Sequence, residues 1–141
     1  MKILGIEHVA IAVEDLDEPA RIFHQILGIR DRKTEEVLDQ QVITDILDTG
    51  GGKVEFLKPT AADSPISKFL RKRGPGLHHI AFLVDDLSAW LEHLREQGVE
   101  LIDKEPRTGA EGTLIAFLHP RSTAGVLVEL CQSQRDPCGK P

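Results

Sequence analysis

Cysteine is scarce in this sequence, and long apolar runs are missing. The 141 residues include two cysteines, Cys131 and Cys138, and the second lies in the polar segment QSQRDPCGKP. Two cysteines placed in this way provide neither a disulfide framework nor a CxxC zinc site. No apolar run approaches the roughly 20 residues that a transmembrane helix requires. We therefore expect a globular protein without a membrane partner, in which any metal ion is held by ligands other than cysteine.

Basic residues are also fewer than acidic residues. Lysine and arginine total 17 against 23 aspartates and glutamates, which gives a formal net charge of -6. This balance argues against a nucleic-acid partner and leaves only local basic segments, of which KFLRKR at 68–73 is the strongest. The N-terminal segment MKILGIEHVAIAV has one lysine followed by an amphipathic strand pattern, which is not the order of a signal peptide. A cytoplasmic location is the expectation.

An internal repeat is the strongest feature that the sequence does contain. The segments IEHVAIAVEDL at 6–16 and LHHIAFLVDDL at 77–87 carry the same His, Ala, Val, Asp and Leu residues at matching positions. Each segment predicts a strand and an Asp-rich turn, followed by an amphipathic helix. Asp17 and Ser88 are the candidate N-caps of the two helices.

Each half then continues with a polar linker and a strand pair around a Gly-containing turn, at 41–57 and at 112–130. The repeat therefore predicts the α+β fold class, with two tandem βαβββ modules that form a curved mixed sheet around a metal-binding cleft. We expect one domain over residues 1–141. Its parts are module 1 at about 4–58, a connector at 59–76, module 2 at 77–132 and a flexible tail at 133–141.

Strand alternation separates the two adjacent histidines, His78 and His79. Neighbouring side chains of a strand point to opposite faces, so only one of the two can face a given site. In the first copy, His8 shares a face with the small residues Ala10 and Ala12, whereas the bulky residues of the other face suit packing against the helix. His79 repeats His8. The alternation therefore predicts that His79 faces the cleft and that His78 makes a structural contact.

The last strand of each module carries a glutamate among aliphatic residues, Glu55 in KVEFL and Glu129 in VLVELC. A buried carboxylate needs water, a partner cation or a metal ion. Alone, a strand histidine is more often structural and a strand glutamate is more often exposed to solvent. The recurrence of both residue types in register favours a metal site built from His8, Glu55, His79 and Glu129. Such a set suits a divalent ion such as Co, Mn, Ni, Fe or Zn.

The strand segments EHVAIAV, HHIAFLV, VEFL and VLVEL resemble those of the vicinal oxygen chelate superfamily, which includes glyoxalases and bleomycin resistance proteins. Two longer segments, DSPISKFLRKRGPGLHHIAF and PRTGAEGTLIAFLHPRSTAGVLVELC, are similar to the methylmalonyl-CoA epimerases of that superfamily. The likeness runs from Ile6 to Cys131. The resemblance implies a metal-dependent isomerase that interconverts (R)- and (S)-methylmalonyl-CoA in propionate metabolism, acts on an acyl-CoA substrate and forms a homodimer.

The resemblance also implies residue roles. His8, Glu55, His79 and Glu129 fall on the family's metal positions, with Co²⁺ as the first expectation for the ion, and Glu129 falls on the position of a catalytic base. Some family members have a glutamine where Glu55 stands. The reaction removes the α-proton of a thioester and returns it to the opposite face, through an enolate that a divalent ion stabilises.

The second base is the point at which this sequence departs from the family pattern. Some family members have a glutamate at the position that corresponds to Thr44, and a threonine hydroxyl is no base at neutral pH. Three explanations stay open. A one-residue shift brings in Asp45, a ligand carboxylate or water serves as the base, or the protein catalyses another reaction.

Two other functions are alternatives to the epimerase. A glyoxalase I-like lyase would use a similar His/Glu set on a glutathione hemithioacetal, and a drug-binding protein would keep the fold without the metal. The four ligand candidates argue against the drug-binding protein, and the segment DSPISKF favours the epimerase over the lyase. A group of basic residues either meets the phosphates of coenzyme A or forms a solvated helix face: Lys68, Arg71, Lys72 and Arg73.

Overall fold

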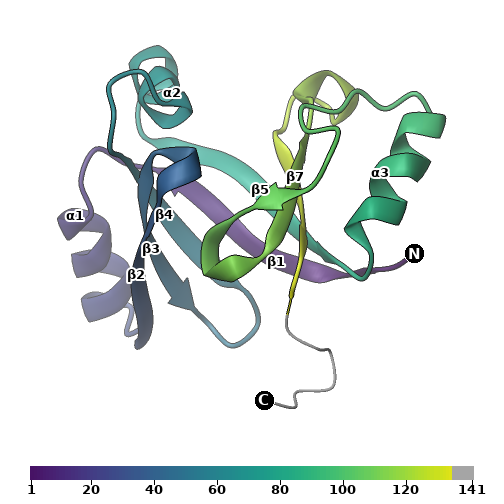
Figure 1. Cartoon of the computed structure of the whole chain (residues 1–141). Helices are drawn as coiled ribbons and strands as arrows, with labels where there is room; N and C mark the ends of the chain where they lie inside the picture. The colour runs from purple at the N-terminus through teal and green to yellow at the C-terminus, as the bar shows by residue number, and fades with distance from the viewer. Residues whose placement is uncertain (135–141) are drawn as a thin grey trace. The chain divides into compact units, whose positions relative to one another are not determined.

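A computed structural model describes residues 1–134 of the chain (Figure 1). Most of the predicted flexible tail, including Cys138, lies outside the described residues. The chain divides into two compact units, which we call the first half and the second half. The first half spans His8–His78, and the second joins Met1–Glu7 to the chain from His79 onward. The boundary passes through the first strand and through the strand that carries the histidine doublet.

The first half has the predicted βαβββ order. Its elements are β1 (Ile3–Ala12, from His8 onward), α1 (Asp17–Pro19), η1 (Ala20–Ile26), β2 (Asp31–Val37), η2 (Leu38–Gln40), β3 (Val42–Asp48), β4 (Lys53–Pro59) and α2 (Pro65–Arg73). The strands lie in the order β2-β3-β4-β1. Because β1 and β4 are parallel and the other neighbours are antiparallel, the sheet of this half is mixed, as predicted.

The second half repeats this order. Its elements are β5 (Gly76–Val84, from His79 onward), α3 (Leu87–Glu96), β6 (Arg107–Thr108), η3 (Ala110–Gly112), β7 (Leu114–Leu118), η4 (Pro120–Ser122) and β8 (Val128–Gln132). The strands lie in the order β5-β8-β7-β6, and β5 and β8 are the parallel pair. The predicted α+β class with two βαβββ modules is therefore confirmed.

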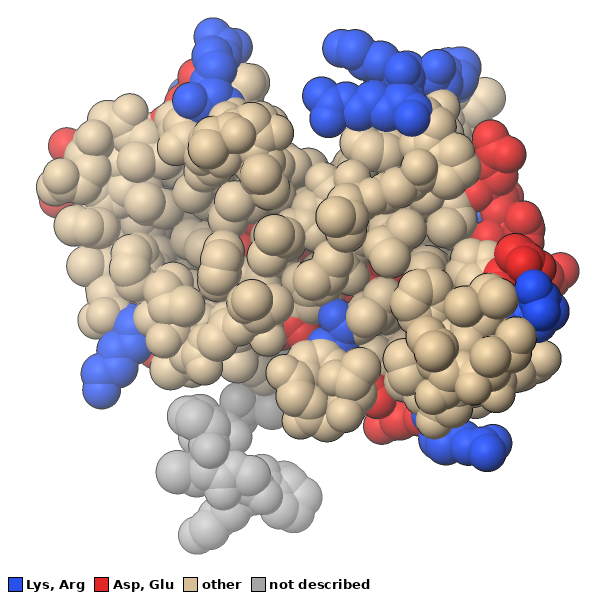
Figure 2. All heavy atoms as spheres, turned by 180° about the vertical axis from the view of Figure 1, so that it is seen from behind, with Lys and Arg blue, Asp and Glu red and all other residues tan. Residues whose placement is uncertain are grey.

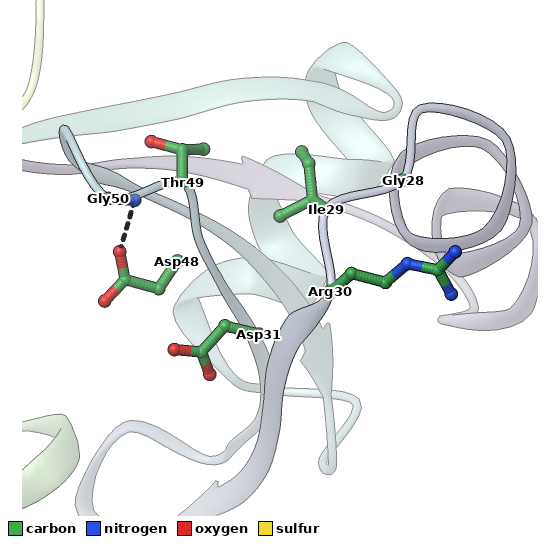
Figure 3. A pocket seen from close by; sticks show the side chains of 7 residues that line it. All are labelled: Gly28, Ile29, Arg30, Asp31, Asp48, Thr49 and Gly50. Carbon is green, nitrogen blue, oxygen red and sulfur yellow. Dashed lines mark hydrogen bonds between the residues drawn. The ribbon is translucent and has the colours of Figure 1, made fainter.

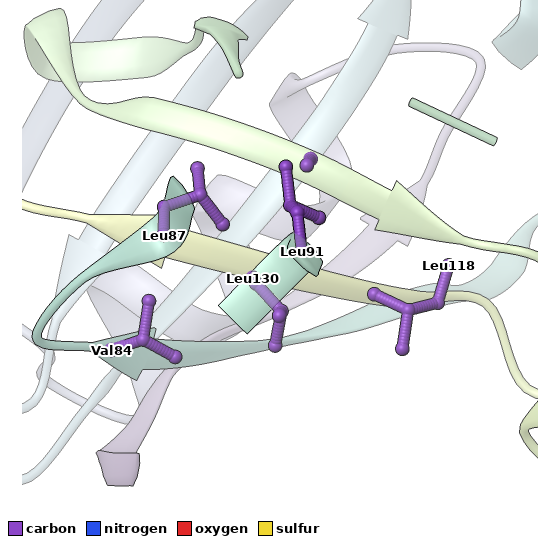
Figure 4. Close-up of a cluster of buried hydrophobic side chains, with 6 residues drawn as sticks. Val84, Leu87, Leu91, Leu118 and Leu130 are labelled. Carbon is purple, nitrogen blue, oxygen red and sulfur yellow. The ribbon is translucent and has the colours of Figure 1, made fainter. Parts of the chain in front are cut away.

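Helical segments cover one face of the sheet in each half. In the first half, the Phe23 ring of η1 packs against the Phe56 ring of β4, with 4.9 Å between ring centroids, beside buried Leu47. In the second half, α3 and the sheet contribute the buried cluster of Val84, Leu87, Leu91, Ala116, Leu118 and Leu130 (Figure 4). Because strand side chains alternate, the residues between these core positions point to the other face of each sheet.

The first turn of each helix is capped two positions earlier than the sequence predicts. The carboxylate of Asp15 accepts a hydrogen bond from the Asp17 N–H at 2.9 Å, and that of Asp86 accepts one from the Ala89 N–H at 3.0 Å. The candidate caps Asp17 and Ser88 were therefore wrong, because both residues already belong to the helices that follow.

The helix of the first half also departs from α-helical geometry. In η1, a π-helix, the N–H of Leu27 donates to the Ile22 carbonyl five residues earlier. Helical spacing alone would place Ile26 and Leu27 on the apolar face, yet they are 62% and 61% exposed at the end of this wider helix. None of the helices among residues 1–134 is long and apolar enough to cross a membrane.

Candidate metal centre

His8 and Glu55 form a buried pair in the first half. They lie on the parallel neighbours β1 and β4, where Glu55 pairs with Ala10, two residues beyond His8. Nε2 of His8 lies 3.0 Å from Oε2 of Glu55, and the two side chains are 6% and 7% exposed. Both point to the face away from the Phe23–Phe56 core, because Glu55 alternates with Phe56 along β4.

His79 and Glu129 form the equivalent pair in the second half. They lie on the parallel neighbours β5 and β8, where Glu129 pairs with Ala81, again two residues beyond the histidine. Nε2 of His79 lies 2.8 Å from Oε2 of Glu129, and the side chains are 4% and 6% exposed. The Phe117 ring packs edge-on against the His79 imidazole, with 5.2 Å between ring centroids. The strand pattern alone did not predict this aromatic contact.

The donor set of each pair fits a divalent metal ion. His8, Glu55, His79 and Glu129 are all buried, and each offers one nitrogen or oxygen atom that can bind a metal. Burial of a carboxylate is unfavourable unless a partner compensates it, and here one oxygen of each carboxylate lies beside an imidazole nitrogen. Imidazole nitrogen and carboxylate oxygen are the ligands that borderline and hard divalent ions take.

His78, the neighbour of His79, has a different environment. It is half-buried, and its ring meets the edge of the Phe69 ring of α2, with 4.9 Å between centroids and 79° between ring planes. Within the first half, His78 thus packs against the connector helix. The two members of the doublet have the separate surroundings that strand alternation predicts.

Asp45 lies on the opposite face of its sheet from Glu55. Its carboxylate is fully buried and accepts two hydrogen bonds from Arg32 Nε, both at 3.0 Å, and one from the Thr34 hydroxyl at 2.9 Å. Asp45 holds the pKa of Arg32 above its usual value through these hydrogen bonds. Asp45 also pairs with Phe56 across β3 and β4, so it points to the core side of the sheet. The one-residue shift considered above therefore does not bring Asp45 onto the face of Glu55.

Thr44, by contrast, lies on the same face as Glu55. It pairs with Leu57, while Ile46, two residues further along β3, pairs with Glu55 itself. Only 2% of Thr44 is exposed. The face of the first half that carries the His8–Glu55 pair therefore has a hydroxyl, rather than a carboxylate, at this position of β3.

The basic residues of α2 are exposed. The last turn holds Arg71, Lys72 and Arg73, and Lys68 lies one turn earlier. Nη1 of Arg71 donates to the Ala62 carbonyl at 2.6 Å. Figure 2 shows a group of Lys and Arg side chains projecting at the upper right, where α2 lies in that view. This helix therefore presents positive charge to solvent.

The first half has an open pocket of about 550 Å³, which is lined by none of the predicted metal ligands (Figure 3). Residues 28–31 and 48–50 line it, and the carboxylate of Asp48 accepts a hydrogen bond from the Gly50 N–H at 2.8 Å. That bond closes the turn between β3 and β4, so the Asp48 carboxylate already has a structural role. The pocket contains none of the four ligand candidates.

Comparisons with known proteins add to these observations. The model of the Glyoxalase/Bleomycin resistance protein/Dioxygenase superfamily matches residues 7–117. The Bacillus subtilis protein YqjC is 44% identical over 131 residues, which cover 93% of this chain and 94% of that protein. Human mitochondrial methylmalonyl-CoA epimerase is 37% identical over 129 residues, which cover 91% of this chain and 73% of that protein.

Among solved structures, a variant of Streptomyces coelicolor methylmalonyl-CoA epimerase in complex with 2-nitronate-propionyl-CoA is similar over its whole length. The TM-score is 0.88 and the identity 36%, over 95% of this chain and 100% of that chain. The fold of the present chain is therefore that of the methylmalonyl-CoA epimerase structures.

Proposed function

This chain belongs to the glyoxalase/bleomycin resistance protein/dioxygenase superfamily, and we propose that it is a metal-dependent epimerase of methylmalonyl-CoA. The observation that carries the proposal is the repeated buried His–Glu pair, built in the same register in both halves. The epimerases among its relatives, which align over about nine-tenths of this chain, support the substrate assignment.

His8, Glu55, His79 and Glu129 together hold one divalent ion in this proposal. Co²⁺ is the first expectation, and Mn, Ni, Fe and Zn fit the same mixed set of nitrogen and oxygen ligands. When bound, the ion acts as a Lewis acid that stabilises the negative charge of the enolate. The burial of all four side chains supports this assignment, since it keeps competing water away from the donor atoms.

Glu129 is the proposed base for one face of the substrate. Its carboxylate removes the proton from C2, and the electron pair of the broken C–H bond moves to the thioester oxygen to form the enolate. A carboxylate has two oxygens, so Glu129 can contribute one to the ligand set and use the other for proton transfer. Return of a proton to the opposite face of C2 gives the other epimer, and that step needs a second acid.

The exposed basic residues of α2 suit the phosphates of the acyl-CoA substrate. In a chain of net charge -6, they are a local concentration of positive charge. α2 packs on β4, the strand that carries Glu55, and its Phe69 ring meets the His78 ring within the first half. We assign Lys68 and Lys72 to this role, since both side chains are exposed.

A homodimer is the proposed assembly. Ile3, Leu4 and Ile6 at the start of β1 are 47%, 54% and 55% exposed, and together they form an exposed group of large apolar side chains within four residues of the strand. A second copy that covers this segment would remove it from water. The cytoplasmic location stays a prediction from the sequence.

Solvent exchange tests the function directly. The purified chain is stripped of metal, reloaded with Co²⁺ and mixed with methylmalonyl-CoA in D₂O. We expect deuterium to enter C2 together with interconversion of the two epimers, both followed by NMR, and neither should occur with metal-free protein. Isomerisation of a glutathione hemithioacetal without exchange into methylmalonyl-CoA would instead identify a glyoxalase I-like lyase. Stoichiometric binding of a drug by metal-free protein would identify a binding protein.

A further inference from the structure

Arg107 brings positive charge to the face of the second half that carries His79 and Glu129. It pairs with Ile115 across β6 and β7, and Ile115 pairs in turn with Cys131 across β7 and β8. Directly paired residues point to the same face of a sheet, and so do residues two apart along a strand. Because Cys131 is two residues from Glu129, Arg107 projects from the same face as Glu129. This relation holds within the second half alone.

The Arg107 side chain lies over a ring that also contacts the His–Glu pair. Its guanidinium is 5.6 Å from the centre of the Phe117 ring, and Phe117 is the direct partner of Glu129 across β7 and β8. The same ring packs edge-on against the His79 imidazole. Phe117 is therefore a common neighbour of the cation and of the candidate metal ligand His79. A small substrate that lies on this ring can reach both.

Asp103 fixes the orientation of the guanidinium. Its Oδ1 lies 3.1 Å from Arg107 Nε, and its Oδ2 accepts a hydrogen bond from the Phe117 N–H at 2.8 Å. The ion pair thus engages the Nε side of the guanidinium, and 39% of the Arg107 side chain is exposed. The remaining N–H donors of an arginine are on Nη1 and Nη2, and they form the fork that binds a carboxylate through two parallel hydrogen bonds.

The surroundings of Arg107 on this face are apolar. Ile115, Phe117 and Cys131 form a buried cluster, and Leu127 packs against it. Among the described strands of the second half, β5, β7 and β8 contain no lysine or arginine, so Arg107 is the one such cation of these strands. A cation beside an apolar surface attracts an anion more strongly than a fully solvated cation does, because less water screens its charge.

We propose that Arg107 binds the free carboxylate of the substrate, and that it thereby selects malonate-type thioesters over simple acyl-CoA esters. This inference rests on the proposed epimerase function. C2 of methylmalonyl-CoA carries a thioester, a methyl group and a carboxylate that is ionised at neutral pH. A carboxylate held by Nη1 and Nη2 fixes the orientation of C2, and hence of the C–H bond that the base must reach. The cation also offsets repulsion between this carboxylate and the negative charge that develops on the thioester oxygen.

The test compares the binding of two thioesters that differ only at C2, where methylmalonyl-CoA has a carboxylate and propionyl-CoA has hydrogen. Isothermal titration calorimetry with the Co²⁺-loaded protein measures both Kd values, with methylmalonyl-CoA supplied as an equilibrated mixture of its epimers. For Arg107→Gln we expect the Kd of methylmalonyl-CoA to rise about 10- to 100-fold, as for the loss of charged hydrogen bonds. The Kd of propionyl-CoA should stay the same. Arg107→Lys keeps the charge without the fork and should give a smaller rise.

Arg95→Gln is the matched control and should leave both Kd values unchanged. Arg95 belongs to α3, which covers the other face of this sheet, and its Nη2 donates to the Lys104 carbonyl at 3.3 Å. Bound Co²⁺ and the circular dichroism spectrum should be the same in all variants.

Two results for Arg107→Gln would overturn the inference. One is an unchanged Kd of methylmalonyl-CoA. The other is an equal rise for both thioesters, since a structural role or a contact with the nucleotide phosphates affects both. Deuterium exchange at C2 of methylmalonyl-CoA is followed in parallel with the unchanged protein. Absence of that exchange would remove the proposed function, whereas exchange together with either result above would remove this inference alone.

Discussion

The two halves of the chain build the same His–Glu pair and differ on the strands outside it. In each half, the glutamate is paired across the two strands with an alanine, Ala10 in the first half and Ala81 in the second. The histidine lies two residues before that alanine. On the next strand, the first half carries Thr44 where the second carries Ile115. Within the repeated unit, the two halves therefore agree most closely on the pair of inner parallel strands.

The outermost strands diverge further. The partner of Thr44 is Glu35, whereas the equivalent partner of Ile115 is Arg107. The Arg107 guanidinium lies 5.6 Å from the centre of the Phe117 ring, which in turn meets His79. Equivalent positions thus carry a carboxylate in one half and a cation in the other. The comparison teaches that the inner strands carry the same ligand candidates in both halves, while the outer strands carry side chains of opposite charge at equivalent positions.

Removal of a ligand histidine is the largest expected effect, and it tests whether the two pairs are equivalent. His8→Ala and His79→Ala should each weaken Co²⁺ binding by more than about 100-fold, because changes in the partners of metal ligands alone typically cost 10–100-fold. Isothermal titration calorimetry with the metal-free protein measures this effect. His78→Ala is the matched control and should bind Co²⁺ like the unchanged protein, since the His78 ring packs on Phe69. Equal loss in the His78 and His79 variants would contradict the assignment by strand alternation.

The Asp45–Arg32 ion pair belongs to the first half alone at this position of the repeat, because the second half has Ala116 at the position equivalent to Asp45. Asp45→Asn should lower the free energy of unfolding by about 1–3 kcal/mol, because Arg32 and Thr34 then lose a charged acceptor. Urea unfolding measures the change. Epimerisation by the folded variant should stay near that of the unchanged protein. A large loss of epimerisation at unchanged stability would instead make Asp45 the second acid–base group.

The smallest expected effect concerns α2, which belongs to the connector and not to the repeat. Lys68→Glu combined with Lys72→Glu should raise the KM for methylmalonyl-CoA about 2- to 10-fold, as expected for exposed charge pairs. The KM for a methylmalonyl-pantetheine thioester, which lacks the nucleotide, should not change. Lys104→Glu, an exposed lysine of the second half, is the control. An equal rise in KM for both thioesters would show that these lysines do not meet the nucleotide phosphates.

Much of the fold and of the candidate site could be predicted from single segments. The repeat predicted the order of strands and helices in both halves, because each βαβββ unit follows from local periodicity and turn residues. The same periodicity placed His79 and Glu129 on one face of their sheet. The metal role of the four residues stays a prediction. Helix starts were predicted less accurately, because the first helical N–H groups donate to the carboxylates of Asp15 and Asp86 rather than to Asp17 and Ser88.

The sequence by itself determined which side of its strand each histidine and glutamate occupies, because alternation is a property of consecutive residues. Only the tertiary structure decided which residues lie opposite one another. The register between β2, β3 and β4 joined Asp45 to Arg32 and set Glu35 beside Thr44. That register depends on turn geometry and on packing between strands, which no single segment encodes. The contacts between side chains of neighbouring strands could therefore be described only once the strands were paired.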